Sequence, residues 1–165
     1  KDCKDVTMDE AMDYVLGYTC ANDLSTRDWQ KVPEMAGGQW CRSKMFDNFA
    51  PLGPVMVTKD EIPNPHVLQL QTWVNGELMQ DSTTGDLIFN VPQLISFLSI
   101  GTTIPAGTVI LTGTPKGVAE GRTPQNWLKP GDKVAVQVEK IGRLENTIVA
   151  DKSSAKSFAH IPSKL

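Results

Sequence analysis

Alternating apolar and polar positions predict a β-hairpin in the middle of the chain. The segment LQLQTWVNGELMQD contains Asn75-Gly76, a residue pair that favours a type I′ turn between two antiparallel strands. Alternation divides the first strand into one face with Leu68, Leu70, Thr72 and Val74 and another with Gln69, Gln71 and Trp73. The pattern therefore predicts a hairpin whose two faces differ in character.

Similar patterns predict further strands on both sides of the hairpin. Before it, residues 15–25 carry β-branched and aromatic side chains and end in small polar ones, and residues 40–45 have a strand-like pattern. After it, the predicted strands cover residues 108–112, 134–138 and, beyond a turn at Gly142, 146–150. A strand that ends in polar residues can deliver side chains to a site, so the end of the first strand is a place for chemistry.

Two short helices are predicted, one before the first of these strands and one after the hairpin. Thr7 and Glu10 have the spacing of a capping box, which favours a helix over residues 8–13. Asn90 can cap a second helix that has Pro92 in its first turn, an apolar stripe, and a length of about nine residues. Residues 29–39 mix Gly, Pro and polar side chains, so we expect an irregular loop that is mobile and orders over a bound ligand.

Composition and element order together predict the fold class. The 165 residues, of which 40% are hydrophobic and 21% charged, suit a single domain over residues 1–165. The strands and short helices do not alternate regularly, which disfavours a Rossmann sheet and favours a mixed, β-rich α+β fold.

Charge and cysteine content exclude several classes of protein. The net charge of −3 lacks the basic surplus that binding a phosphate backbone requires, so we expect no nucleic-acid partner. No apolar run reaches the length of a membrane span, so we expect no membrane association. Three cysteines without a CxxC or zinc pattern indicate a reducing, intracellular compartment, and the two distant histidines suggest no nucleophilic triad.

Five polar segments could carry chemistry, namely residues 22–28, 42–44, 83–86, 112–117 and 130–132. Three of them suggest a particular chemistry, and each of these also has a plainer interpretation. Residues 22–28 place two carboxylates and an arginine beyond a strand, which suits a metal or carboxylate ligand, or a helix cap with a local ion pair. Residues 112–117 could present N–H groups and hydroxyls to an anion, although a simple turn is the better interpretation from spacing alone. Lys44, between Trp40 and Phe46, could contact a substrate oxygen from an apolar setting, or could be a surface lysine.

Several segments, taken in order, resemble the fumarylacetoacetate hydrolase family, in particular its smaller domain-containing members. They are CANDLSTRDWQ, QWCRSKMFDNFAPLGP, VNGELMQ, TGDLIFNVPQLISFLS and AGTVILTGTPKGV, and the resemblance covers residues 7–148. Membership implies a β-roll with short helices, usually a homodimer. It also implies a divalent cation, commonly Mg²⁺ with Mn²⁺ or Ca²⁺ as alternatives, that chelates a β-keto acid or acylpyruvate.

The resemblance also implies roles for individual residues. Asp23 matches a metal-binding aspartate, and Lys44 and Arg27 match catalytic positions. Gln30, Gly113 and Thr114 match substrate-binding positions, with Thr114 at the carboxylate end of the substrate. A cation together with Lys44 would stabilise an enolate while a C–C bond breaks or a proton moves.

The sequence departs from the family pattern in two places. The family takes two further metal ligands from a Glu-x-Glu motif, and this motif does not occur in the 165 residues. The His-Glu pair that activates water in hydrolytic members is also absent. We therefore expect the chain to be the C-terminal portion of a longer protein and to lack part of the domain at its N-terminal side.

Two functional hypotheses follow. The first is a metal-dependent enzyme that hydrolyses, decarboxylates or tautomerises acylpyruvate-like or oxaloacetate-like acids through a metal-bound enolate. The second is a noncatalytic relative that keeps the fold and the dimer surface. The expected partner is a small keto acid, and the expected location is the cytoplasm or the mitochondrion.

Overall fold

A computed structural model describes residues 1–33 and 38–151 of the chain. Most of the strands form a four-stranded antiparallel sheet of order β4-β3-β5-β6. Its strands are β3 (Gln69–Val74), β4 (Glu77–Thr83), β5 (Lys133–Val138) and β6 (Gly142–Thr147). A second, two-stranded antiparallel sheet pairs β1 (Gly17–Ala21) with β2 (Leu52–Thr58). The predicted β-rich α+β class is confirmed.

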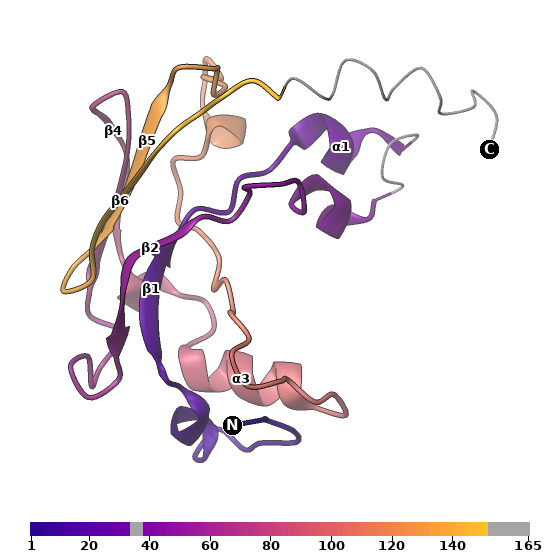
Figure 1. Cartoon of the computed structure of the whole chain (residues 1–165), viewed down its shortest axis with the longest axis vertical. Coiled ribbons are helices and arrows are strands. Elements are labelled where there is room, and N and C mark those ends of the chain that lie inside the picture. The colour runs from indigo at the N-terminus through magenta and orange to yellow at the C-terminus, as the bar shows by residue number, and fades with distance from the viewer. Residues whose placement is uncertain (34–37, 152–165) are drawn as a thin grey trace.

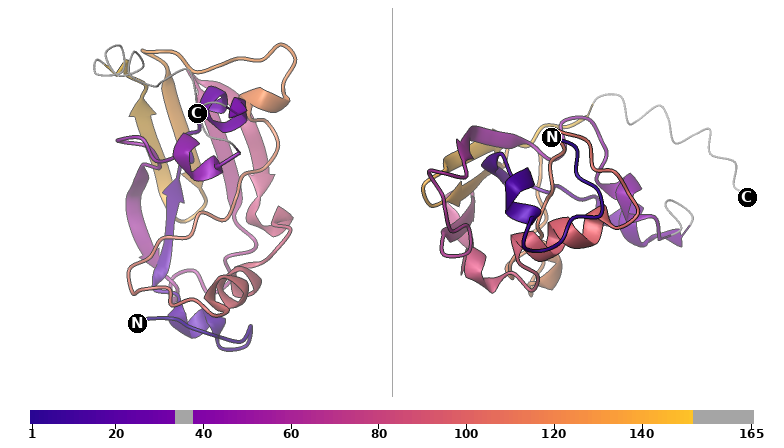
Figure 2. Two further views of the ribbon diagram at one scale, coloured as in Figure 1. Left: turned by 90° about the vertical axis from the view of Figure 1, so that its right-hand side faces the viewer. Right: turned by 90° about the horizontal axis from the view of Figure 1, so that it is seen from below.

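The helices are short and lie at the two ends of the strands. The α-helices are α1 (Arg27–Lys31) and α3 (Val91–Ser99), and the 3-10 helices are η1 (Ala11–Tyr14), η2 (Trp40–Ser43), η3 (Thr84–Asp86) and η4 (Ala119–Gly121). Helix α1 lies at one end and α3 at the opposite end, as two perpendicular views agree (Figure 1, Figure 2). The chain after α3 runs back along the strands towards η4 (Figure 1).

The hairpin and the second helix form as predicted. Asn75 and Gly76 adopt φ values of 51° and 85°, as a type I′ turn requires, and they join β3 to β4. Asn90 and Gln93 exchange the two hydrogen bonds of a capping box at the start of the nine-residue α3. The predicted cap at Asn90 is therefore confirmed.

Two predicted strands are wrong. Residues 40–43 form η2 because the Ser43 hydroxyl donates to the Trp40 carbonyl at 2.6 Å and the segment packs against α1. Residues 108–112 are not in a strand, because no neighbouring strand among the described residues pairs with them. A strand pattern alone cannot supply the hydrogen-bonding partner.

Other boundaries also differ from the prediction. The first helix is η1 and not residues 8–13, since the Thr7 hydroxyl donates to Glu10 at 2.7 Å instead of accepting from the helix backbone. Strand β6 begins at Gly142 and ends at Thr147, not in residues 146–150. Residues 29–31 are helical, and residues 34–37 of the expected loop lie outside the described residues, so its mobility stays a prediction.

The main core lies between the two sheets. It contains Cys20 of β1, Val136 and Val138 of β5, and Leu144 of β6, with Tyr18 and Leu70 packed against it. A second cluster joins Ala11 of η1 to Ile95 of α3 and fixes that helix below the strands. Within residues 1–33 and 38–151, no helix has the length and apolar character needed to cross a membrane.

Candidate functional site

A cavity of about 670 Å³ lies along the inner face of the four-stranded sheet. Its floor contains Leu68, Leu70 and Thr72, which share one face of the predicted hairpin strand, and Val136 of β5. Its other walls come from β1, from the loop that follows β1, and from residues 104–115. Among the sequence-predicted site residues, those that line this cavity are Asp23, Arg27, Lys44, Gly113 and Thr114.

Asp23 and Lys44 form the charged centre of the cavity wall. Lys44 Nζ lies 2.5 Å from Asp23 Oδ2 and 2.8 Å from the hydroxyl oxygen of Ser25. The lysine side chain is 32% exposed and the aspartate side chain 38%, so the pair is accessible from solvent. An ammonium has three N–H donors, and these contacts engage two of them, which leaves one for a ligand oxygen.

The backbone around these residues explains why they meet. Asp23 lies two residues beyond the end of β1. Thr26 is hydrogen-bonded to the Ser43 carbonyl through both its amide, at 3.0 Å, and its hydroxyl, at 3.1 Å. These bonds join the loop after β1 to η2, and Lys44 follows η2 immediately. Two segments about twenty residues apart are therefore held side by side.

The aromatic residues near Lys44 have a different role from the one predicted. Phe46 packs edge to face against Trp29 at a centroid distance of 5.6 Å. The guanidinium carbon of Arg42 lies 4.6 Å from the centre of the Trp29 ring and 4.4 Å from the centre of the Phe46 ring. Trp40 is 63% exposed. The polar partners of the Lys44 ammonium are oxygens, and the rings of Trp29 and Phe46 contact Arg42. An apolar setting for Lys44 stays a prediction.

Arg27 and Gln30 occupy successive turns of α1. Gln30 is buried, and its side-chain oxygen accepts a hydrogen bond from the Arg27 guanidinium. The Gln30 amide nitrogen has no partner among the described residues. Arg27 lines the cavity, whereas Gln30 does not. Gln30 orients the arginine through its bond to the guanidinium. A contact between Gln30 itself and a substrate stays a prediction.

Gly113 and Thr114 line the same cavity from the segment that runs back from α3. Gln80 of β4, which the sequence analysis did not single out, donates from its amide nitrogen to the Thr114 hydroxyl oxygen and to the Pro115 carbonyl, each at 2.9 Å. Gly113 has φ +100° with open space around its Cα, which suits a residue whose amide faces a ligand.

Cysteine chemistry finds no support in this cavity. Cys20 is fully buried, and burial raises the pKa of its thiol above the ordinary value, so the thiolate nucleophile is disfavoured there. Within residues 1–33 and 38–151, no three His, Cys, Asp or Glu side chains come together as a metal cluster. The cations Arg27 and Lys44 among the lining residues are groups that could bind an anionic ligand.

Residues 1–149 match the family described as the C-terminal domain of fumarylacetoacetate (FAA) hydrolase. The chain belongs to the fumarylacetoacetate hydrolase family. The resemblance in the sequence is thereby confirmed, and the family fold agrees with the β-rich arrangement described above.

A mitochondrial oxaloacetate tautomerase of Xenopus laevis is 44% identical over 146 residues, which cover 88% of this chain and 45% of that protein. A fumarylacetoacetate hydrolase of Exiguobacterium antarcticum is a structural neighbour with TM-score 0.86 and 39% identity, covering 92% of this chain and 53% of the other. The chain spans about half the length of the curated relatives that it matches.

A maleylpyruvate hydrolase of Sphingobium, solved with manganese(II) and pyruvate, has TM-score 0.76 and 30% identity; the match covers 90% of this chain and 50% of that one. These relatives are enzymes of keto acids. Their activities differ, since one is a tautomerase and two are hydrolases.

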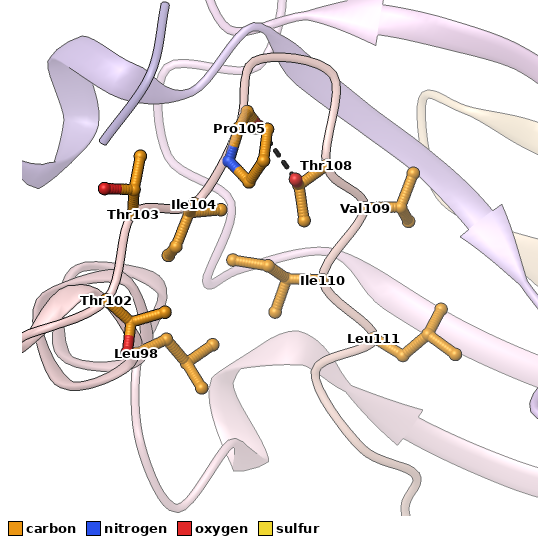
Figure 3. A pocket seen from close by; sticks show the side chains of 9 residues that line it. All are labelled: Leu98, Thr102, Thr103, Ile104, Pro105, Thr108, Val109, Ile110 and Leu111. Atoms are coloured by element: carbon orange, nitrogen blue, oxygen red, sulfur yellow. Dashed lines mark hydrogen bonds between the residues drawn. The ribbon is translucent and has the colours of Figure 1, made fainter. Parts of the chain in front are cut away.

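A second hollow, of about 490 Å³, lies beside the C-terminal end of α3. Figure 3 shows Leu98, Ile104 and Ile110 facing a common space, with Thr102 and Thr108 near its edges. Within it, the Thr108 hydroxyl, at 2.7 Å, and the Thr108 amide, at 3.2 Å, both donate to the Pro105 carbonyl. It offers no charged side chain for catalysis.

Proposed function

We propose that the protein is an enzyme that acts on acylpyruvates or β-keto acids by forming an enolate. The observation that carries this proposal is a single cavity lined by Lys44, Arg27, Gly113 and Thr114. Breaking a C–C bond or removing a proton beside a ketone leaves negative charge on the ketone oxygen. The unused N–H of Lys44 is a donor for that oxygen, and Arg27 and Thr114 are suited to a carboxylate.

The proposal includes a divalent cation, for which Asp23 is one oxygen ligand. Hard cations such as Mg²⁺, Mn²⁺ and Ca²⁺ prefer carboxylates, and a bound cation would withdraw electrons from the keto acid. Asp23 is the one acidic residue among the described residues that line the cavity, and no three His, Cys, Asp or Glu side chains cluster in the described part of the chain. These residues do not form a complete metal centre by themselves, so coordination would also need water, substrate or further protein ligands.

Metal binding by Asp23 can be tested by calorimetry on the full-length protein. We expect Asp23→Asn to weaken Mn²⁺ and Mg²⁺ binding at least tenfold, because the amide lacks the charge of the carboxylate. Asp28→Asn, a change of the same kind at an exposed residue of α1, should leave the affinity unchanged. Equal metal affinity in wild type and Asp23→Asn would remove Asp23 from the site.

Activity assays separate the proposed reactions. Oxaloacetate tautomerisation, oxaloacetate decarboxylation and acylpyruvate hydrolysis are each followed with added Mg²⁺ and again with chelator. We expect acceleration of at least one reaction that chelator abolishes. A folded protein that accelerates none of them would overturn the enzyme proposal and favour the noncatalytic relative.

We also propose a homodimer inside the cell, as the family resemblance implies. Several large apolar side chains are exposed, among them Ile88 at 89%, Phe97 at 73% and Phe89 at 60%, and burial of exposed apolar side chains favours association. Light scattering of the full-length protein at micromolar concentration should give twice the protomer mass. A stable monomer under these conditions would contradict the dimer.

A further inference from the structure

Gln80 is a buried polar residue on the cavity side of β4. It pairs with Thr72 across the hairpin, and both residues line the cavity. The register shifts between Thr72 and Trp73, so that Met79 is an extra residue in β4 and both Met79 and Gln80 are buried. Gln80 is 9% exposed, a burial that a side-chain amide tolerates when it is hydrogen-bonded.

The partners of Gln80 fix which way its amide points. The Pro115 carbonyl can only accept, so the group that faces it at 2.9 Å must be the amide nitrogen and not the amide oxygen. The same nitrogen lies 2.9 Å from the Thr114 hydroxyl oxygen, which must therefore accept as well. A hydroxyl that accepts in this direction has to point its own proton elsewhere.

The Thr114 proton has no acceptor within the described part of the chain. Thr114 is exposed and lines the cavity, and the bond from Gln80 is the one hydrogen bond of its hydroxyl within residues 1–33 and 38–151. Residues 109–117 also have no backbone–backbone hydrogen bonds in this described part. The bond from Gln80 thus fixes both the position of Thr114 and the direction in which its hydroxyl can donate.

We propose that Gln80 is a positioning residue that makes the Thr114 hydroxyl a donor into the cavity, and thereby selects a ligand with an anionic oxygen. This inference rests on the proposed function, because the ligand oxygen is that of the keto-acid carboxylate. A bond from a neutral hydroxyl to a carboxylate is stronger than one to a neutral ester oxygen. Gln80 therefore favours the acid over its ester.

The test measures binding of pyruvate and of methyl pyruvate to the full-length protein by calorimetry, at one saturating Mg²⁺ concentration. Gln80→Met removes both donated bonds, and we expect it to weaken pyruvate binding roughly tenfold while methyl pyruvate binding changes less than about twofold. Gln80→Glu keeps the shape but accepts the Thr114 proton, so it should weaken pyruvate binding at least as much. Gln69→Met on the exposed side of β3 is the matched control.

A double-mutant cycle separates this role from mere support of the loop. Thr114→Val should weaken pyruvate binding roughly tenfold, and adding Gln80→Met to it should cost no more than about a further twofold, because the hydroxyl through which Gln80 acts is gone. Thr114→Ser, which retains the hydroxyl, should restore both the affinity and the sensitivity to Gln80→Met. Full additivity in the double variant would assign Gln80 to loop support alone and overturn the inference.

The outcomes distinguish this inference from the proposed function. If wild type binds pyruvate and Thr114→Val weakens it, but Gln80→Met and Gln80→Glu bind as wild type does, the inference fails and the proposed function stands. If wild type binds neither pyruvate nor oxaloacetate, the proposed function fails and the role of Gln80 is overturned with it.

Discussion

Replacing Lys44 with alanine is expected to lower kcat by roughly a hundredfold or more, the scale on which one donor to a developing oxyanion acts. Lys44 contacts Asp23 and Ser25 in the cavity wall, and one of its three N–H donors remains for the substrate. Because the oxygen charge develops only as the enolate forms, the loss should fall on kcat and less on KM. Initial rates with oxaloacetate and with acylpyruvates measure both constants.

Two further substitutions make this result specific to the ammonium group. Lys44→Arg should not restore kcat, because a planar guanidinium cannot replace a compact charge that reaches Asp23 and Ser25 together. Lys31→Ala removes a lysine from an exposed ion pair with Glu120 and should leave kcat unchanged. Near-normal kcat in Lys44→Ala with both substrate classes would leave Lys44 as a surface lysine.

The elements that the sequence predicted correctly are those with a complete local signal. Asn75-Gly76 sets its own turn, and Asn90 with Gln93 closes a capping box within four residues. Residues 108–112 have the composition of a strand but find no strand beside them in the described chain. Strand β2 was not predicted, since Gly53 and Pro54 near its start conceal its pattern.

The site was predictable only as far as family resemblance and local motifs reach. Asp23, Arg27 and Lys44 occur in recognisable segments, and the structure brings them to one cavity. Gln80 was missed because a lone polar residue in a strand is usually assigned to the solvent face, and its partner Thr114 is 34 residues away. The bulge that buries it depends on pairing between strands, which no single segment encodes.

Gly117 lies where the segment that carries Thr114 packs against β4, and among the described glycines it is the one most sensitive to an added methyl group. A Cβ at Gly117 would lie 2.1 Å from the Met79 carbonyl oxygen, and its φ of +110° is one that other residues rarely adopt. Arg122 bonds to both backbones, with Nε 3.0 Å from the Gly117 carbonyl and Nη2 2.9 Å from that of Met79. The loop cannot retreat from the methyl group without breaking this bridge.

We therefore expect Gly117→Ala to lower the free energy of unfolding by about 3 kcal/mol or more, since backbone strain and overpacking each cost about 1–3 kcal/mol. Two other glycines separate these causes in urea unfolding. Gly131→Ala, with φ +95° and open space, should show the strain alone, and Gly121→Ala, with open space and an ordinary φ, should change stability little. If Gly117→Ala proves no less stable than Gly131→Ala, the close packing of the loop on Met79 does not hold. Pyruvate binding in the folded fraction of Gly117→Ala should fall as well, because moving this loop separates Thr114 from Gln80.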